Sequence, residues 1–315
     1  MTEHALVQWL RQNNHFLILT HVRPDGDTLG CASALCLALN KLGKTAYLLR
    51  NPGDLQKFKG FLTFLWAPDD YMPDHVIAVD IATENLLPQG AHQAYRGRVE
   101  VCVDHHASND GYARELCLDT GASACGEILF RVCRQLGVLD EQIAKALYIA
   151  IATDCGGFIY SNTTSETHRI AAALMEYGDF RKLNKHFFQT KSFKQLRLES
   201  MVLGSEEFYA DGQVCIGKIS LADKASVGAD EGDCEELASF AASIEGVGCA
   251  ATLRELTPGE WKVSLRSVDT YADSNRICAR LGGGGHAAAA GATVLGTEES
   301  VRRQVCDAIF QELKR

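Results

Sequence analysis

Residues 16–43 read FLILTHVRPDGDTLGCASALCLALNKLG, and this stretch decides the fold. Residues 16–20 form a short apolar run that predicts a buried strand. Apolar residues then recur at three- and four-residue spacing from Leu29 to Leu42, which predicts a helix over residues 28–42. Gly43 follows at the position where helices commonly end. A strand, a polar turn and a helix in this order are typical of a parallel sheet with helices on both faces.

The same alternation continues through the first half of the chain. Further strands are predicted at residues 45–50, 75–80 and 99–104. Amphipathic helices are predicted at residues 122–136 and 141–153. The fold class is therefore α/β, with a doubly wound, mainly parallel sheet in a first domain over residues 1–185.

The second half has a different pattern. Residues 186–209 are polar and helical, which predicts a helical linker. Residues 210–315 are expected to form a smaller mixed α/β domain. Its predicted elements are strands at 214–219, 249–256 and 261–267, a glycine-rich turn at 282–285, a helical segment that opens at His286, and a helix at 298–313.

Composition excludes several classes of protein. The chain has 315 residues, 31 Lys+Arg and 40 Asp+Glu, so its formal charge is −9. This charge disfavours binding of long nucleic acid, but it permits a small phosphorylated substrate whose charge metal ions balance. No apolar run has the length of a membrane span, and the N-terminus lacks the apolar core of a signal peptide. The twelve cysteines include no CxxC pair, and buried, reduced thiols in a cytoplasmic protein explain them best.

The turn HVRPDGD, residues 21–27, lies directly after the first strand. The carboxyl ends of parallel strands meet at the edge where α/β proteins bind ligands. His21, Asp25 and Asp27 therefore offer metal-ligating side chains at that edge. The alternative is an Asp-rich turn that caps the following helix, with Asp27 or Thr28 as the N-cap residue.

Three other predicted elements end in the same way. Asp80 ends one strand, Asp104, His105 and His106 end another, and Asp154 closes an apolar helix. Four of these carboxylates are expected in one place and repel one another unless cations neutralise them, namely those of Asp25, Asp27, Asp80 and Asp154. Oxygen ligands with a few imidazoles suit Mn²⁺ or Mg²⁺ better than structural zinc, and two such ions favour phosphoester hydrolysis. The combination favours a metal site over capping alone.

These motifs, in this order, resemble those of the DHH phosphoesterase superfamily. Gly282-Gly283-Gly284-Gly285-His286, followed by Ala289-Ala290-Gly291, is similar to the DHH-associated C-terminal domain. The resemblance covers essentially the whole chain and is strongest to the nanoRNase branch. It implies two Mn²⁺ ions, with Mg²⁺ or Co²⁺ as alternatives. It also implies short oligoribonucleotides and 3′-phosphoadenosine 5′-phosphate (pAp) as substrates.

The resemblance also implies roles for individual residues. One metal ion would be held by His21, Asp25 and Asp80. The other would be held by Asp27, Asp80, His105 and Asp154, so that Asp80 bridges both ions. His106 would lie beside the substrate phosphate as a hydrogen-bond donor or an acid, and Asp104 would orient the histidine pair.

In the second domain the resemblance implies substrate binding. The expected residues are Arg266, Ser267, Gly283, Gly284, Gly285 and His286. A guanidinium group matches the geometry of phosphate, and glycines let the backbone approach an anion closely. Cys155 replaces a hydroxyl residue of many relatives, while Cys125 and Gly126 are interpreted as packing changes.

The leading hypothesis is a manganese-dependent phosphoesterase that hydrolyses short oligoribonucleotides and pAp by water that two metal ions activate. In this hypothesis the second domain closes over the substrate. The alternatives are a phosphodiesterase for the linear dinucleotides pApA and pGpG, an inorganic pyrophosphatase, and a nucleotide-binding regulator without catalysis. The resemblance leaves a homodimer open, and no membrane partner is expected.

Overall fold

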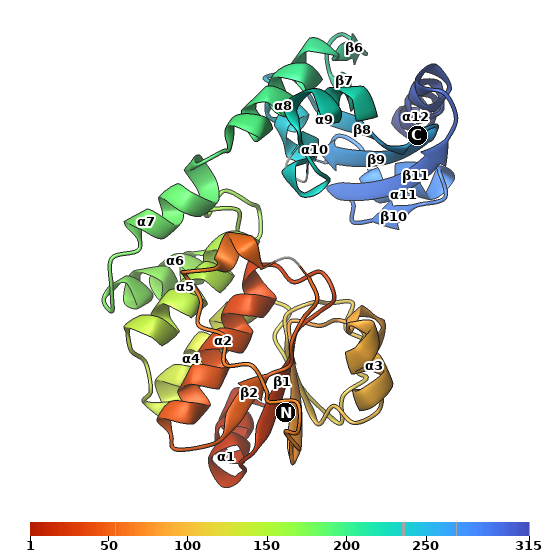
Figure 1. Ribbon diagram of the computed structural model, residues 1–315. Helices are drawn as coiled ribbons and strands as arrows, with labels where there is room; N and C mark the ends of the chain where they lie inside the picture. The colour runs from red at the N-terminus through yellow and green to blue at the C-terminus, as the bar shows by residue number, and fades with distance from the viewer. Residues whose placement is uncertain (54, 235–236, 269, 315) are drawn as a thin grey trace. The chain divides into compact units, whose positions relative to one another are not determined.

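The computed structural model describes residues 1–53, 55–234, 237–268 and 270–314 (Figure 1). The chain divides into two compact units, Met1–Thr190 and Lys191–Arg315. None of the helices in the described ranges has the length and apolar character needed to cross a membrane. Each unit has its own sheet and its own core.

The first unit contains a five-stranded parallel sheet with the strand order β2-β1-β3-β4-β5. Its strands are β1 (Phe16–Leu19), β2 (Ala46–Leu48), β3 (His75–Val79), β4 (Val101–Asp104) and β5 (Glu115–Leu118). Its α-helices are α1 (Glu3–Gln12), α2 (Gly26–Lys41), α3 (Gln89–Tyr95), α4 (Cys125–Leu136), α5 (Glu141–Asp154), α6 (Ser165–Met175) and α7 (Arg181–Asn184). Short helical turns lie at Gln56–Phe58, Glu84–Leu86 and Lys185–Gln189.

Helices cover both faces of this sheet, so the predicted doubly wound α/β fold is confirmed (Figure 1). Side chains alternate along each strand. Phe16 and Ile18 of β1 therefore pack in the core that contains α1, α2, α4 and α5. Leu17 and Leu19 pack on the opposite face, with Ala91 of α3. Because β1 is buried on both sides, its four residues are all apolar.

Helix α2 begins at Gly26, two residues earlier than its hydrophobic spacing predicts. The expectation of Asp27 or Thr28 as the N-cap residue was wrong, because Asp25 occupies that position. Oδ1 of Asp25 accepts hydrogen bonds from the backbone N–H groups of Asp27 and Thr28. This capping extends the helix into the polar turn and fixes the direction of the Asp27 side chain.

The second unit contains a six-stranded mixed sheet with the order β10-β11-β9-β8-β7-β6. Its strands are β6 (Glu207–Tyr209), β7 (Val214–Ile219), β8 (Cys249–Thr257), β9 (Glu260–Ser267), β10 (Gly284–Gly285) and β11 (Ala289–Leu295). Its α-helices are α8 (Phe193–Gly204), α9 (Leu221–Val227), α10 (Leu237–Phe240), α11 (Ser274–Arg280) and α12 (Glu298–Leu313). Short 3₁₀ turns lie at Gly232–Cys234 and Ala241–Ser243. Trp261, Val263 and Leu265 of β9 pack in a core that α11 and α12 complete.

The prediction that a helical segment opens at His286 was wrong. His286 lies in the turn between β10 and β11, where its N–H donates to the carbonyl of Ala289. Alanine favours helices, but here residues 289–295 pair with β9 over their whole length. Tertiary pairing therefore overrides local propensity, and the glycine-rich segment forms a hairpin at the sheet edge.

Candidate metal centre

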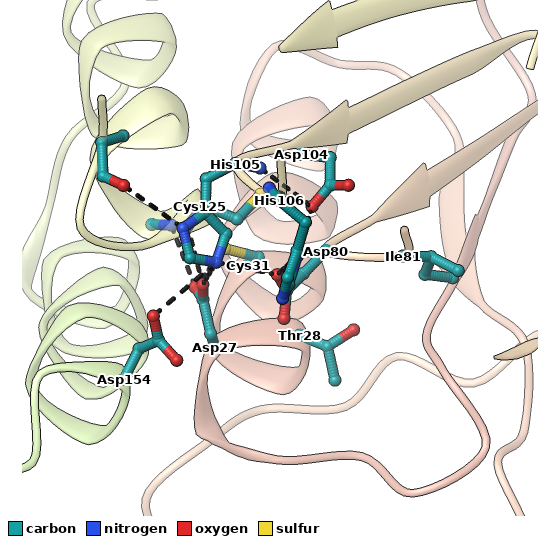
Figure 2. A network of polar contacts seen from close by, with 12 residues as sticks. Asp27, Thr28, Cys31, Asp80, Ile81, Asp104, His105, His106, Cys125 and Asp154 are labelled. Atoms are coloured by element: carbon teal, nitrogen blue, oxygen red, sulfur yellow. Dashed lines mark hydrogen bonds and ion pairs between the residues drawn. The ribbon is translucent and has the colours of Figure 1, made fainter. Parts of the chain in front are cut away.

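The predicted ligands of the first unit converge at one edge of its sheet. Figure 2 shows four of them, Asp27, Asp80, His105 and Asp154. Asp80 directly follows β3, and His105 directly follows β4. His21 follows β1, and Asp27 lies in the first turn of α2. Asp154 is the last residue of α5. Because the strands are parallel, their carboxyl ends bring side chains together from distant parts of the sequence.

Three groups of ligand atoms lie close enough to hold a metal ion, with all atoms of a group within 4.8 Å of one another. They are His21, Asp25 and Asp80; Asp27, His105 and Asp154; and Asp80, His105 and His106. The structure thus brings together all six predicted metal ligands, and Asp80 belongs to two of the groups.

The separations within these groups are longer than hydrogen bonds. The Nε2 atom of His105 lies 3.8 Å from Oδ2 of Asp27, 3.5 Å from Oδ1 of Asp80 and 3.6 Å from Oδ2 of Asp154. The Nε2 atom of His21 lies 3.5 Å from Oδ2 of Asp25. Such spacing leaves room for an ion between the side chains, which a direct hydrogen bond would not.

Two of these atoms are buried without a partner. Oδ1 of Asp80 and Nε2 of His105 make no hydrogen bond within the part of the chain that the structure describes. A buried polar atom without a partner is costly, so its presence calls for an explanation. A divalent cation bound by carboxylate oxygen and imidazole nitrogen satisfies both atoms, and the donor set fits Mn²⁺ or Mg²⁺.

Asp80 has an unusual backbone conformation. Its φ is 59°, in the left-handed region, and its N–H donates to the carbonyl of Val103 at 2.9 Å. Aspartate tolerates this region better than bulky or branched residues do. The turn directs the carboxylate toward both His21 and His105 instead of continuing the strand.

Asp27 is fixed by the main chain of another helix. Its Oδ2 accepts a hydrogen bond from the N–H of Cys125 at 2.7 Å, and its Oδ1 accepts one from the N–H of Gly126 at 3.0 Å. The Sγ of Cys31 donates to the same Oδ1. The N-terminus of α4 also attracts negative charge. From sequence, Cys125 and Gly126 were interpreted only as packing changes, because backbone donors leave no side-chain signal.

Asp104 holds His106 in place. Its Oδ1 accepts a hydrogen bond from Nδ1 of His106 at 2.8 Å and from the backbone N–H groups of His105 and His106. Its Oδ2 accepts a hydrogen bond from Asn109 at 2.6 Å. Nδ1 of His106 also lies 3.5 Å from Asp80, but it is already used by Asp104. The geometry therefore gives Asp104 an orienting position and leaves Nε2 of His106 as the ring's second functional nitrogen.

The electrostatics of the cluster are those of crowded, buried carboxylates. Burial, and then the charges of Asp154 and Asp25, raise the pKa of Asp27 well above its ordinary value. Burial, and then neighbouring carboxylates, do the same to the pKa of Asp80. The pKa of Asp154 is raised to about 6, by burial and by the charge of Asp25. Bound cations would remove this repulsion.

The pKa values of the remaining groups of the cluster are lowered, or are raised by a different cause. Burial raises the pKa of Asp25, but the hydrogen bond and charge of His21 and two backbone donors outweigh it, so the pKa is lowered. Burial lowers the pKa of His105, which favours the neutral, metal-ligating imidazole. The hydrogen bond to Asp104 raises the pKa of His106.

The second unit contains a groove of about 350 Å³ on its sheet. Arg266, Gly284 and Gly285, all predicted to bind substrate, line this groove. Arg254 and Lys262 line it as well, and sequence reasoning missed both. The alternation of Lys262, Ser264 and Arg266 on β9 is the signal that could have found Lys262, because these residues share one face of the strand.

Three other predicted residues lie outside the lining of this groove. The Oγ of Ser267 accepts a hydrogen bond from the N–H of Ala272. His286 lies exposed in the turn that joins β10 and β11. Gly283 packs so closely that a Cβ there would lie 2.1 Å from the carbonyl oxygen of Gly291. Gly283 is therefore required for the close approach of the two strands of the hairpin.

Comparison with known proteins places this arrangement in a family. Residues 15–151 match the DHH family, N-terminal domain, and residues 211–315 match the DHHA1 domain. The chain therefore belongs to the DHH phosphoesterase family and is a hydrolase of phosphoric ester bonds. Within the family it belongs to the nanoRNase and pAp-phosphatase branch, as the motifs predicted.

Two curated relatives and one solved structure illustrate the similarity. The bifunctional oligoribonuclease and PAP phosphatase NrnA of Thermus thermophilus is 31% identical over 304 residues, which cover 95% of this chain and 90% of that protein. The probable bifunctional oligoribonuclease and PAP phosphatase NrnA of Streptococcus mutans is 30% identical, with coverage of 95% and 93%. An exopolyphosphatase-related protein from Bacteroides fragilis has the same fold, with a TM-score of 0.89 at 23% identity and coverage of 99% and 97%.

Proposed function

We propose that this protein is a manganese-dependent phosphoesterase that hydrolyses short oligoribonucleotides and pAp with two metal ions. The observation that carries the proposal is the position of Asp80, whose carboxylate belongs to two ligand groups and has a buried, unpartnered oxygen. A carboxylate shared between two groups is the arrangement expected of a two-metal hydrolase.

The metal ligands divide between the two ions. His21, Asp25 and Asp80 would hold one ion. The group of Asp27, His105 and Asp154 would hold the other, together with Asp80, whose Oδ1 lies 3.5 Å from Nε2 of His105. Bound divalent cations supply positive charge that makes water more acidic and neutralises the phosphate. Oδ1 of Asp25 is used as the helix cap, so its Oδ2, which faces His21, is the oxygen left for an ion.

His106 is the candidate proton donor. Asp104 accepts the Nδ1 hydrogen bond, which leaves Nε2 to donate to a phosphate oxygen or to the leaving group. The raised pKa of His106 keeps a larger share of the ring protonated near neutral pH. Asp104 acts by orienting the ring and stabilising its positive charge.

The relatives and the second unit support short nucleotides as substrates. Both NrnA relatives carry the names of an oligoribonuclease and a PAP phosphatase. The groove of the second unit presents Lys262 and Arg266 on a chain of formal charge −9, whereas Arg254 forms an ion pair with Glu231 at 2.8 Å. This local positive charge suits a few phosphates and not a long polyanion.

We assign the metal chemistry to residues 1–185 and substrate binding to residues 210–315, with 186–209 as the connecting segment. All twelve cysteines are free, and eleven of them are buried. Free thiols in this number support a reducing compartment, which we propose is the cytoplasm.

The proposed function is tested with purified protein, with and without Mn²⁺, on pApA, pAp and pyrophosphate in parallel. Metal-dependent release of AMP from pApA and of phosphate from pAp is the expected result. Hydrolysis of pyrophosphate alone would contradict the proposal and indicate a pyrophosphatase. Binding of Mn²⁺ without turnover of any of the three would indicate a nucleotide-binding regulator.

A further inference from the structure

Residues 155–163 directly follow the metal ligand Asp154 and expose two large apolar side chains. Ile159 is 84% exposed and Tyr160 is 56% exposed. The amide of Asn162 donates to the carbonyl oxygens of Asp154 and Ser123, so the segment is tied to the metal centre through the main chain. An exposed aromatic residue beside a buried metal site needs a reason, because burial of such a ring is favourable.

The backbone of this segment accounts for the exposure. Gly156, Gly157 and Phe158 have consecutive φ values of 55°, 70° and 70°. The left-handed conformation is strained for a residue as bulky as Phe158. The Phe158 ring packs against Tyr148 and His168, with centroids 6.0 and 5.4 Å away. With Phe158 held inward, the next residues face solvent.

The ring of Tyr160 is not a loose surface side chain. A Cβ placed on Gly156 would lie 2.4, 2.5 and 2.6 Å from Cζ, Cε1 and Cε2 of Tyr160. A point nearly equidistant from three ring atoms stands over the face of the ring, not at its edge. One face of the ring therefore lies against Gly156, and this close contact requires a residue without a side chain. Tyr160 is nevertheless 56% exposed, so its accessible area lies on the side of the ring away from Gly156.

A fixed ring with one free face is a stacking surface for another flat, apolar group. Nucleobases stack on aromatic side chains with little dependence on base identity. The base of a nucleotide lies next to its own phosphate, and the segment of Tyr160 is joined to the candidate metal centre by the hydrogen bond from Asn162 to the carbonyl of Asp154. Pyrophosphate has no base and gains nothing from this surface.

We infer that Tyr160 binds the nucleobase of the substrate by stacking and gives the metal centre its preference for nucleotides over base-free phosphates. This inference rests on the proposed function for the identity of the ligand. It assigns Tyr160 as a substrate-positioning residue, with Gly156 as the residue that holds its ring.

The test is a binding measurement that does not depend on turnover. AMP and ribose 5-phosphate differ only by the base, and calorimetry on the Mn²⁺-loaded protein measures the affinity of each. The wild-type protein is expected to bind AMP about ten-fold more tightly than ribose 5-phosphate. Tyr160→Ala is expected to bind both ligands alike, with the affinity for ribose 5-phosphate unchanged. Tyr160→Phe is expected to keep the preference.

Two further variants separate stacking from a structural role. Ile159→Ala removes the more exposed neighbour and is expected to keep the preference for AMP. Gly156→Ala is expected to displace the ring and lose the preference. The stabilisation of each variant by Mn²⁺, measured by thermal unfolding, shows whether the centre at Asp154 is intact.

Several outcomes would overturn the inference. Equal binding of AMP and ribose 5-phosphate by the wild-type protein, or binding of neither, would do so. A preference retained in Tyr160→Ala would do so as well, as would an equal loss of affinity for both ligands in that variant. A different result would refute only the proposed function. In that case the protein would hydrolyse neither pAp nor pApA, but its preference for AMP would still depend on Tyr160, which would support the stacking role.

Discussion

The metal centre of the first unit and the groove of the second differ in both charge and surroundings. Asp27 and Asp80 are 1% and 4% exposed, whereas Lys262 and Arg266 are partly exposed at an open sheet face. Buried carboxylates repel one another and bind cations strongly, because few water molecules are present to screen their charges. Cations at an open face are hydrated and bind anions more weakly.

The comparison assigns different tasks to the two regions. The buried centre is suited to hold ions permanently and to perform the chemistry, so damage to it should reduce turnover. The open groove is suited to bind and release phosphates, so damage to it should change substrate affinity. Each of the following variants tests one side of this division.

Replacement of Asp80 by Asn should have the largest effect. Asparagine also tolerates the left-handed backbone at this position, so the fold should persist. Loss of several kcal/mol of transition-state stabilisation corresponds to roughly a thousand-fold fall in kcat or more. Hydrolysis of pAp and pApA with Mn²⁺ measures the effect. Asp74→Asn, at the opposite end of β3 and 65% exposed, is the matched control and should keep full activity. A variant at Asp80 with normal kcat would refute the shared carboxylate.

Replacement of Arg266 by Gln should come next. Loss of a charge-assisted hydrogen bond to phosphate is expected to raise KM for pApA about 10- to 100-fold. The stabilisation by Mn²⁺ should not change, because the metal ligands belong to the other unit. Arg303→Gln on the exposed face of α12 is the control. A fall in kcat with unchanged KM would show that the groove takes part in the chemical step. It would contradict the assignment of substrate affinity to the groove and of turnover to the metal centre.

Replacement of Asp104 by Asn should reduce kcat about ten-fold near pH 7.5. The hydrogen bond to Asp104 raises the pKa of His106, so its loss lowers that pKa. If protonated His106 donates the proton, activity falls as pH rises through this pKa, and the alkaline limb of the kcat profile should move to lower pH in the variant. Asp110→Asn, exposed in the same loop, is the control. An alkaline limb at the wild-type position would exclude His106 as the acid.

The smallest expected effect is one on stability: replacement of Asp154 by Asn should stabilise the metal-free protein, although it should also reduce turnover because it removes a proposed metal ligand. The folded-state pKa of about 6 lies above the ordinary value of 3.8, so ionisation of Asp154 destabilises the metal-free protein as pH rises from about 4 to 6. The variant avoids this cost, and its Tm with a chelator present is expected to be about 2–6 °C higher at pH 7.5. The difference should shrink as pH falls toward 5. Mn²⁺ should stabilise the wild-type protein more than the variant.

The convergence of the candidate ligands was predictable from sequence because the topology of the sheet determines it. Asp80 and His105 follow apolar runs, and a parallel sheet brings the ends of such runs to one edge. The main-chain donors at Cys125 and Gly126 were not predictable, because every residue carries the same N–H group. Their position depends on how α4 packs, which local sequence does not encode.

Among the elements that were not predicted from sequence, two strands lack strong hydrophobic periodicity. Strand β5 is a short, partly exposed edge strand, and β11 begins with alanines and glycine, which have low strand propensity. Both form through pairing with a neighbouring strand. The groove was found only in part for the same reason, since Arg254 reaches it from β8 and no motif connects it to Arg266.

The position of Asp154 at the end of α5 determines when the last ligand of the candidate metal centre is synthesised. The ligands are spread from His21 to Asp154, and synthesis of the chain begins at its N-terminus. A nascent chain that lacks α5 lacks the Asp154 carboxylate, so the group of Asp27, His105 and Asp154 is incomplete, and an incomplete group holds divalent ions weakly. We therefore expect the ion of this group to bind only after the chain through α5 has been synthesised and folded, so that the supply of metal acts on a folded first unit.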